Sequence, residues 1–300
     1  MSARLSAVFV LTTHFIGSSN ARVTQQVHHR DSTRASSGSP GPRVQLAFGV
    51  MTFQRNEDAY NDTVSDFMRL MGWLYEDERN HVYVLHTDSK CDREVHSAIT
   101  DVYCGSRSNC MALEPRSVTW GGISVVEMNL ALMHAADDFM YPNGSASSWQ
   151  YFALVGHESV PLMKLSYMES FLASYPPGTN FINCWDSDGY DFFGQHEDIL
   201  HRQAAVVIDG FDENTLYEGF DIERKLPHDL KLYKTIQYVV LSRDFVRYVC
   251  KGPDTRRVLM YLANVKASDE LVLPTLLQRS PQFAATATCD TTLHFTHWIR

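Results

Sequence analysis

The sequence predicts an α/β domain with a largely parallel sheet, because two kinds of segment alternate along the chain. Short apolar runs such as residues 44–53 and 149–155 are typical of buried strands. Between them lie segments with apolar side chains every three to four positions, as on one face of a helix. This alternation is typical of β-α-β units. The 300 residues, 44% of them hydrophobic, suffice for a sizeable core.

In the first half, the strand at 44–53 is followed by Asn56, which is placed to cap a helix. The next strand is predicted at 81–88. Parallel sheets bind ligands at the carboxyl ends of their strands, so Asp88 is a candidate ligand contact. A second helix is expected after Gly121-Gly122. The apolar faces of the two helices are formed by Tyr60, Val64, Phe67 and Met71 and by Ile123, Val126, Leu130 and Met133. The remaining predicted elements are strands near 112–113 and at 149–155, 181–184, 204–208 and 237–241, and helices through 168–172, 244–249 and 256–265.

Three regions are predicted from composition. Residues 1–21 carry Arg4 ahead of an apolar run at 5–17, which predicts a signal peptide or a short signal anchor in the membrane. Residues 22–43 are rich in Ser, Gly, Pro, Arg and His, which predicts a flexible stem. The folded domain is then expected to occupy 44–300.

The charge and the cysteines limit the classes of function. A net charge of −9 argues against a general nucleic-acid binder, which needs a basic face. The six cysteines contain no C-x-x-C pair, so a zinc cluster is disfavoured and up to three disulfides are expected. The sequons at Asn61 and Asn143 fit a secreted or luminal glycoprotein. The close spacing of Cys91, Cys104 and Cys110 predicts a stapled loop, without indicating which cysteines pair.

The acidic pair Asp269 and Glu270 has two interpretations. Ser268 is a good N-cap candidate, and acids in the first turn of a helix complement the helix dipole, so the pair fits an ordinary helix start. A sugar-nucleotide transferase, by contrast, needs a carboxylate that accepts the proton of the acceptor hydroxyl. The triplet Asp186-Ser-Asp188 offers a metal-dependent alternative, although a solvated turn explains it more simply. Neither a G-x-G-x-x-G motif nor a P-loop is present.

Seven stretches carry a resemblance when they are taken in order: FGVMT at 48–52, VLHTD at 84–88, VTWGGIS at 118–124, WQYFALVG at 149–156 with PL at 161–162, KTIQYVVLSR at 234–243, SDE at 268–270 with PTLL at 274–277, and CDTTLHFTHW at 289–298. In this order the chain resembles the core-2/I-branching β-1,6-N-acetylglucosaminyltransferases and their xylosyltransferase relatives, glycosyltransferase family 14. The W-G-G form and the ending near Trp298 resemble the xylosyltransferase branch most. The E-x-x-x-P-T pattern is similar to plant-type members.

The resemblance implies a GT-A-like Rossmannoid fold, with a mixed, mainly parallel sheet flanked by helices. It also implies an inverting, metal-independent transfer from a UDP-sugar, either UDP-GlcNAc or UDP-xylose, to a glycan or glycoprotein acceptor in the Golgi or secretory lumen. The roles that it implies are as follows: Glu270 is the catalytic base with Asp269 beside it, Met51, Asp88 and Trp120 contact the donor nucleotide, and Trp298 and Arg202 contact the acceptor.

The chain also departs from the family pattern. The family's diphosphate-binding Arg and Lys lie beyond the position that matches Trp298, so the donor-phosphate part is expected to be missing from this sequence. The acceptor-contacting acid of the branching enzymes falls at Asn183. These departures leave an alternative open, namely a catalytically impaired or truncated transferase-like protein that binds sugar nucleotides or glycans.

Overall fold

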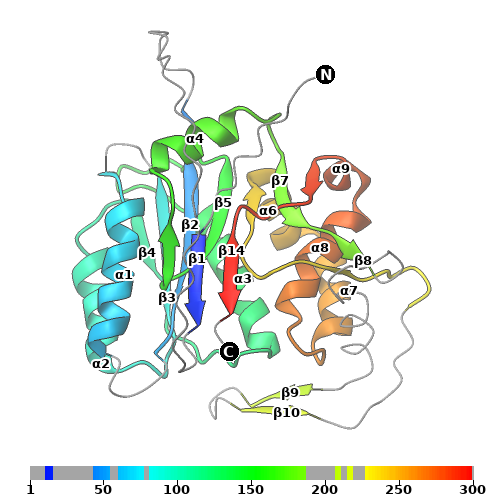
Figure 1. Cartoon of the computed structure of the whole chain (residues 1–300), viewed down its shortest axis with the longest axis horizontal. Coiled ribbons are helices and arrows are strands. Elements are labelled where there is room, and N and C mark those ends of the chain that lie inside the picture. The colour runs from blue at the N-terminus through cyan, green and yellow to red at the C-terminus, as the bar shows by residue number, and fades with distance from the viewer. Residues whose placement is uncertain are drawn as a thin grey trace, which may run out of the picture.

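The computed structural model describes residues 11–15, 43–54, 60–77, 81–186, 207–210, 215–218 and 227–298. At its centre lies a seven-stranded sheet, shown in Figure 1. Its strands, in spatial order, are β13 (Ala287–Cys289), β7 (Asn180–Asn183), β12 (Val240–Ser242), β5 (Tyr151–Gly156), β2 (Leu46–Thr52), β3 (Val82–Thr87) and β4 (Cys110–Ala112). Only β12 runs against the others in this sheet. The predicted α/β class with a mainly parallel sheet is confirmed.

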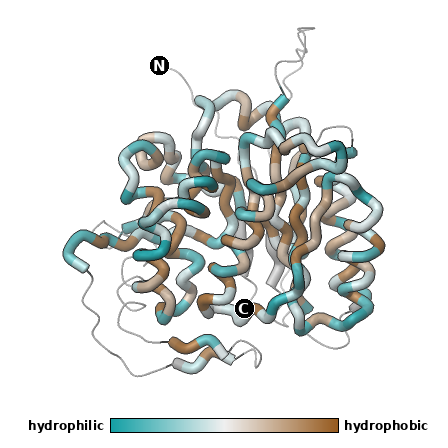
Figure 2. The backbone as a smooth tube through the Cα atoms, turned by 180° about the vertical axis from the view of Figure 1, so that it is seen from behind, coloured by the Kyte–Doolittle hydropathy of each residue, from teal (hydrophilic) through white to brown (hydrophobic). Residues whose placement is uncertain are grey.

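Helices cover both faces of the sheet. They are α1 (Tyr60–Leu74), α2 (Arg93–His96), the π-helix η3 (Ser97–Cys104), α3 (Ile123–Asp137), α4 (Leu165–Ala173), α6 (Arg243–Lys251), α7 (Pro253–Leu262), α8 (Asp269–Arg279) and α9 (Pro281–Ala284). One core packs α1, η3 and α4 on the sheet, and the other packs α3, α6, α7 and α8. Figure 2 shows hydrophobic residues along the central strands.

The alternation of side chains along β2 explains how one strand serves both cores. Leu46, Phe48 and Val50 belong to the core under α1, whereas Ala47 and Met51 belong to the core under α3. Side chains of a strand point alternately to its two faces, so a strand that is covered on both sides reads as a continuous apolar run. This is why β2, β3 and β5 could be predicted from the sequence.

Smaller sheets lie outside the central one. β1 (Leu11–Phe15) pairs in parallel with β14 (Phe295–Trp298) and antiparallel with β6 (Ser159–Pro161). β1 falls within the predicted signal or anchor segment. Most of that segment and nearly all of the predicted stem lie outside the described residues. Within the described ranges, no helix combines the length and the apolar character that crossing a membrane requires.

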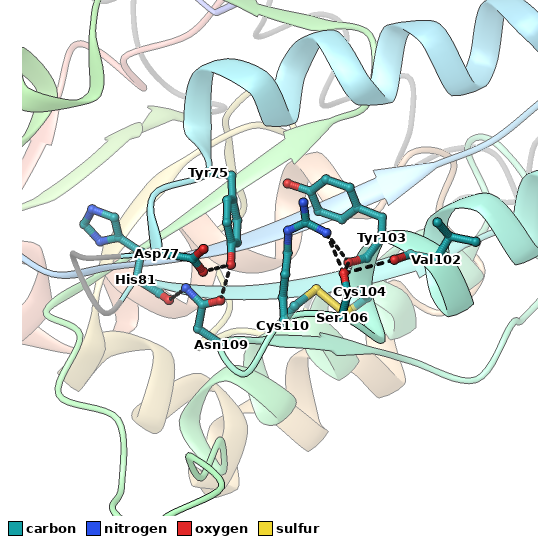
Figure 3. Close-up of a disulfide and its surroundings, with 10 residues drawn as sticks. Tyr75, Asp77, His81, Val102, Tyr103, Cys104, Ser106, Asn109 and Cys110 are labelled. Carbon is teal, nitrogen blue, oxygen red and sulfur yellow. Dashed lines mark hydrogen bonds between the residues drawn. A yellow bond between two sulfur atoms is a disulfide. The ribbon is translucent and has the colours of Figure 1, made fainter.

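The structure contains two of the up to three disulfides that the six cysteines could form. Cys104 at the end of η3 is joined to Cys110 in β4, and Cys184 is joined to Cys289 in β13. Figure 3 shows the first bond and its surroundings, where the Tyr75 hydroxyl donates to Asn109 Oδ1 at 3.0 Å. The stapled loop predicted from the cysteine spacing is therefore present. Cys91 does not take part in it, and its thiol is free, as is that of Cys250.

Ser268 is the N-cap of α8, as predicted, but its side chain does not cap the helix. Its dihedral angles are helical (φ −62°, ψ −21°) rather than the extended ones usual at this position, and its side chain accepts no capping hydrogen bond. The Ser268 carbonyl accepts the Val272 N–H at 2.9 Å. Ala267 precedes Ser268 with a left-handed φ of 50°, and the Ala267 N–H donates to Gly121 O at 2.7 Å. A contact with a distant turn therefore sets the start of this helix.

The carboxylate of Asp137 ties α3 to α6. It lies at the end of α3 and accepts hydrogen bonds from Arg243 Nε at 3.3 Å, Arg247 Nε at 2.7 Å and Lys251 Nζ at 2.8 Å. These cations occupy successive turns of α6. Burial alone would raise the pKa of Asp137, but the hydrogen bonds from Lys251, Arg247 and Arg243 outweigh it and lower the pKa to about 2.

This cluster predicts a pH-dependent contribution to stability. Because the folded pKa of Asp137 lies below the ordinary value of 3.8, its stabilisation is present above about pH 4 and is lost as the pH falls towards 2. We expect Asp137→Asn to lower the free energy of unfolding by about 2 kcal/mol at pH 7, and by much less at pH 2. Urea denaturation at several pH values measures both. Asp138→Asn is the control, because Asp138 is 71% exposed. Equal losses at pH 7 and pH 2 would contradict the assignment.

Gly121 provides a second prediction, because its φ is 80°. An alanine in this left-handed conformation costs roughly 1–2 kcal/mol. We therefore expect Gly121→Ala to lower the free energy of unfolding by about that amount in urea denaturation. The matched control is Gly72→Ala in the last turn of α1, where an added Cβ meets nothing within 4 Å. It should leave stability unchanged or raise it by up to about 1 kcal/mol. Similar losses in both variants would count against a special role for Gly121.

Candidate active site

The predicted donor contacts Met51 and Asp88 lie at the carboxyl ends of neighbouring parallel strands, β2 and β3. Met51 is 9% exposed, its sulfur lies 3.8 Å from Gln237 Nε2, and its carbonyl accepts the N–H of His157 at 2.9 Å. The Asp88 N–H donates to Thr52 O at 2.9 Å, which joins the two strand ends. The structure thus brings these two side chains to the same edge of the sheet, where ligands of parallel sheets bind.

Asp88 is buried and already engaged with protein groups. Its Oδ2 accepts Lys90 Nζ at 2.8 Å and the Val118 N–H at 3.2 Å, and its Oδ1 accepts the Lys90 N–H at 2.9 Å. Lys90 Nζ also donates to Val118 O at 2.9 Å. Asp88 therefore anchors the segment that leads to Trp120. A nucleotide that hydrogen-bonds to the Asp88 carboxylate would share its oxygen atoms with the Lys90 ammonium and with these two N–H groups.

Trp120 lies on the turn before α3, and its side chain is 64% exposed. The turn is held by Asp209 of β9 (Val207–Asp209), whose Oδ2 accepts the Ser124 N–H at 3.0 Å and the Ser124 hydroxyl at 2.5 Å. A Cβ on Gly122 would lie only 2.1 Å from Asp209 Oδ2, so glycine is required there. A carboxylate at the start of a helix also complements the helix dipole.

Sequence reasoning assigned no role to Asp209. The sequence signal for a role of Asp209 is its position directly after the apolar run 204–208, at the carboxyl end of a predicted strand. β9 pairs with β10 (Leu216–Glu218), and the Val207 N–H donates to Asn264 O at 3.0 Å. β9 therefore contacts both the segment that starts α3 after the Trp120 turn and the loop that leads into α8.

Glu270 and Asp269 open α8, and their side chains differ in exposure. The Glu270 side chain is 21% exposed, whereas Asp269 is buried at 7%. Glu270 Oε2 lies 3.7 Å from Lys234 Nζ, and the Glu270 carbonyl accepts the Thr235 N–H at 2.9 Å. A partly exposed carboxylate on a fixed backbone is a suitable base for a hydroxyl proton.

A chain of backbone and side-chain hydrogen bonds connects the residues predicted to contact the donor nucleotide with Glu270. It runs from β2 through Asp88 to Val118, along the Trp120 turn to Gly121, and from Gly121 O to the Ala267 N–H at the start of α8. The structure therefore brings Met51, Asp88 and Trp120 into one connected framework with Glu270. The Trp298 backbone lies in β14. The Trp298 side chain and the whole of Arg202 lie outside the part of the chain that the structure describes. The acceptor contacts predicted for Trp298 and Arg202 therefore remain predictions.

Two histidines near these elements, the buried His86 and the half-buried His294, are held neutral. Burial lowers the pKa of His86 in β3 to about 4, and its Nε2 accepts the Arg116 N–H at 3.2 Å. Burial also lowers the pKa of His294 to about 4, and its ring stacks on Tyr238 with 5.7 Å between ring centroids. His294 Nδ1 lies 2.9 Å from Thr292 O, whereas its Nε2 is buried and has no hydrogen-bond partner among the described residues.

The metal alternative involved Asp186 and Asp188. Asp186 lies in β8 (Trp185–Asp186), and its Oδ2 is 3.0 Å from Lys231 Nζ. Asp188 lies outside the described residues. Within the described ranges, no group of three or more His, Cys, Asp or Glu side chains is arranged to hold a metal ion.

Comparison with known proteins identifies the family. The model of the family described as "Core-2/I-Branching enzyme" matches residues 59–300. The chain is 28% identical over 230 residues to the beta-glucuronosyltransferase GlcAT14A of Arabidopsis thaliana, covering 73% of this chain and 48% of that protein. It is 25% identical over 238 residues to the xylosyltransferase oxt of Drosophila melanogaster, covering 77% of this chain and 24% of the relative.

A human relative belongs to a third donor class. The chain is 21% identical over 216 residues to the beta-1,3-galactosyl-O-glycosyl-glycoprotein beta-1,6-N-acetylglucosaminyltransferase 3 of Homo sapiens, covering 72% of this chain and 45% of that protein. The chain thus spans about half the length, or less, of these curated relatives. The family match nevertheless covers most of the chain, and its residues include the framework from β3 to Glu270. The chain therefore belongs to the Core-2/I-Branching enzyme family of glycosyltransferases.

Proposed function

We propose that the chain transfers a sugar from a UDP-sugar to a hydroxyl of a glycan or glycoprotein acceptor, with inversion at the anomeric carbon and without a metal ion. The observation that carries this proposal is the position of Glu270. Its partly exposed carboxylate opens α8, and the loop before it is hydrogen-bonded to the turn of Trp120. A base on a loop that is tied to the turn of an exposed aromatic ring suits a reaction between a sugar nucleotide and an acceptor.

The proposed step is a single displacement. The acceptor hydroxyl oxygen attacks the anomeric carbon while Glu270 takes its proton, and the bond from that carbon to the diphosphate oxygen breaks. UDP leaves with the bonding electron pair, so its negative charge needs stabilisation by cationic groups. Trp120 would stack on the uracil and Met51 would contact the nucleotide. Asp88 would accept a hydrogen bond from the uridine while its other contacts hold the Trp120 segment.

The donor sugar is proposed only as a class. The resemblance implies GlcNAc or xylose, and the names of the relatives add glucuronic acid. These donors share UDP and differ in the groups on the pyranose ring, so the proposed nucleotide contacts Met51, Asp88 and Trp120 do not distinguish among them. A screen of UDP release with UDP-GlcNAc, UDP-xylose and UDP-glucuronic acid, each with simple glycan acceptors, would identify the donor. UDP binding in calorimetry without any transfer would favour a binding protein instead.

We also propose that the protein works in the secretory pathway, in the Golgi or a related lumen. Its two disulfides support this, because such bonds persist in oxidising compartments. Asn143 lies in an exposed turn, which is accessible for the glycosylation that its sequon predicts. Membrane anchoring through residues 5–17 is part of the same proposal.

The role of Glu270 gives a direct prediction. Glu270→Gln keeps the shape of the side chain but cannot take the proton, so we expect turnover to fall by roughly 10²–10⁴-fold while UDP binding is retained. Initial rates and calorimetry measure the two quantities. Glu94→Gln is the matched control, because Glu94 is exposed on α2, and it should leave turnover unchanged.

Two results would argue against this mechanism. Turnover at the wild-type level in Glu270→Gln would remove Glu270 from the reaction. Loss of transfer in EDTA, with recovery on adding a divalent ion, would favour the metal-dependent alternative.

A further inference from the structure

A proline in α8 alters the hydrogen bonding of Glu270. In a regular helix the carbonyl of one residue accepts the N–H of the residue four positions later. For Glu270 that residue is Pro274, which has no N–H to donate. The Glu270 carbonyl instead accepts the Thr235 N–H at 2.9 Å. The proline therefore makes the backbone of Glu270 available to another segment of the chain.

That segment consists of β11 (Tyr233–Lys234) and Thr235 directly after it, and it is held against α8 at a second position. The Tyr233 N–H donates to Thr275 Oγ1 at 3.0 Å, and the Thr275 hydroxyl is 3.4 Å from Tyr233 O. Thr235 Oγ1 also accepts the Asn183 N–H at 3.2 Å, which joins the segment to the end of β7. The residues on both sides of Lys234 are thus fixed to α8 and to the sheet.

This arrangement aims the Lys234 side chain at the Glu270 carboxylate. Lys234 Nζ lies 3.7 Å from Glu270 Oε2, and the Lys234 side chain is only 10% exposed. A charge pair with little access to water is screened less by solvent than a surface pair. The backbone and the side chain of Glu270 therefore both contact adjacent residues, Lys234 at the end of β11 and Thr235 directly after it.

We propose that Lys234 is a positioning residue for Glu270, and that Pro274 allows the 233–235 segment to dock where it can do this. The inference rests on the proposed function, because it assigns Lys234 a task in that reaction. A Glu side chain has several freely rotating bonds, and a carboxylate that is misplaced by 1 Å loses much of its effect as a base. The ammonium group limits the carboxylate to orientations near β11 without itself exchanging a proton.

The kinetic test compares Lys234→Met, Lys234→Arg and Lys231→Met. We expect Lys234→Met to lower kcat roughly 10–100-fold, with the KM values for donor and acceptor changed by less than about threefold. Lys234→Arg keeps the charge and should recover most of the loss. Lys231→Met is the matched control, since it removes a lysine–carboxylate pair from the same segment and should leave kcat unchanged.

The outcomes separate this inference from the proposed function. If the wild type transfers sugar but Lys234→Met keeps its kcat, the positioning role is overturned while the proposed function stands. A change confined to an increase in the KM for the donor would indicate that Lys234 binds the donor phosphates. That result would also overturn the positioning role. Absence of transfer by the wild type with every donor would overturn the proposed function itself.

Hydrogen exchange tests the docking without any need for activity. Pro274→Ala supplies an N–H that competes for the Glu270 carbonyl, so the Thr235 amide should exchange roughly tenfold faster than in the wild type. Alanine favours the helix, so the variant should fold. Unchanged exchange at Thr235 would overturn the role given to Pro274.

Discussion

The site depends on how the backbone at the start of α8 is held from two sides. The Ala267 N–H donates to the carbonyl of Gly121, and the Glu270 carbonyl accepts the N–H of Thr235. Ala267 takes a left-handed conformation, which costs energy for any residue with a Cβ and persists only where surrounding contacts require it. The orientation of Glu270 is therefore a property of the tertiary structure, since neither of these partners belongs to α8.

The same segments connect the nucleotide side of the site with the base. The Trp120 turn is held by Asp88 on one side and by Asp209 on the other, and Gly121 joins it to α8. These contacts use backbone groups and buried carboxylates, whose hydrogen bonds are costly to break. A nucleotide stacked on Trp120 would thus rest on the same framework that holds the base, which favours a fixed geometry between donor and base.

The sequence predicted the parts of this fold that have a local signal. The strands β2, β3 and β5 and the helices α1 and α3 have apolar patterns that match their burial. The N-cap position of Ser268 could be predicted locally, but the missing side-chain cap could not, because the contact of Ala267 with Gly121, far away in the sequence, shapes the start of α8. β8, β11 and β13 were missed because strands of two or three residues are defined by their pairing rather than by periodicity. Lys234 lay within a recognised stretch, but its proximity to Glu270 arises only from tertiary packing.

The two disulfides have a consequence for the edges of the central sheet. One bond includes Cys110 of β4 and the other Cys289 of β13, and these strands form the two opposite edges. Each is only three residues long, so few backbone hydrogen bonds hold it in place. If either strand detached, a longer and more apolar neighbour would become the edge, open to pairing with another molecule. The covalent bonds at both borders therefore protect the folded chain from self-association, so an oxidising environment matters for its solubility as well as for its shape.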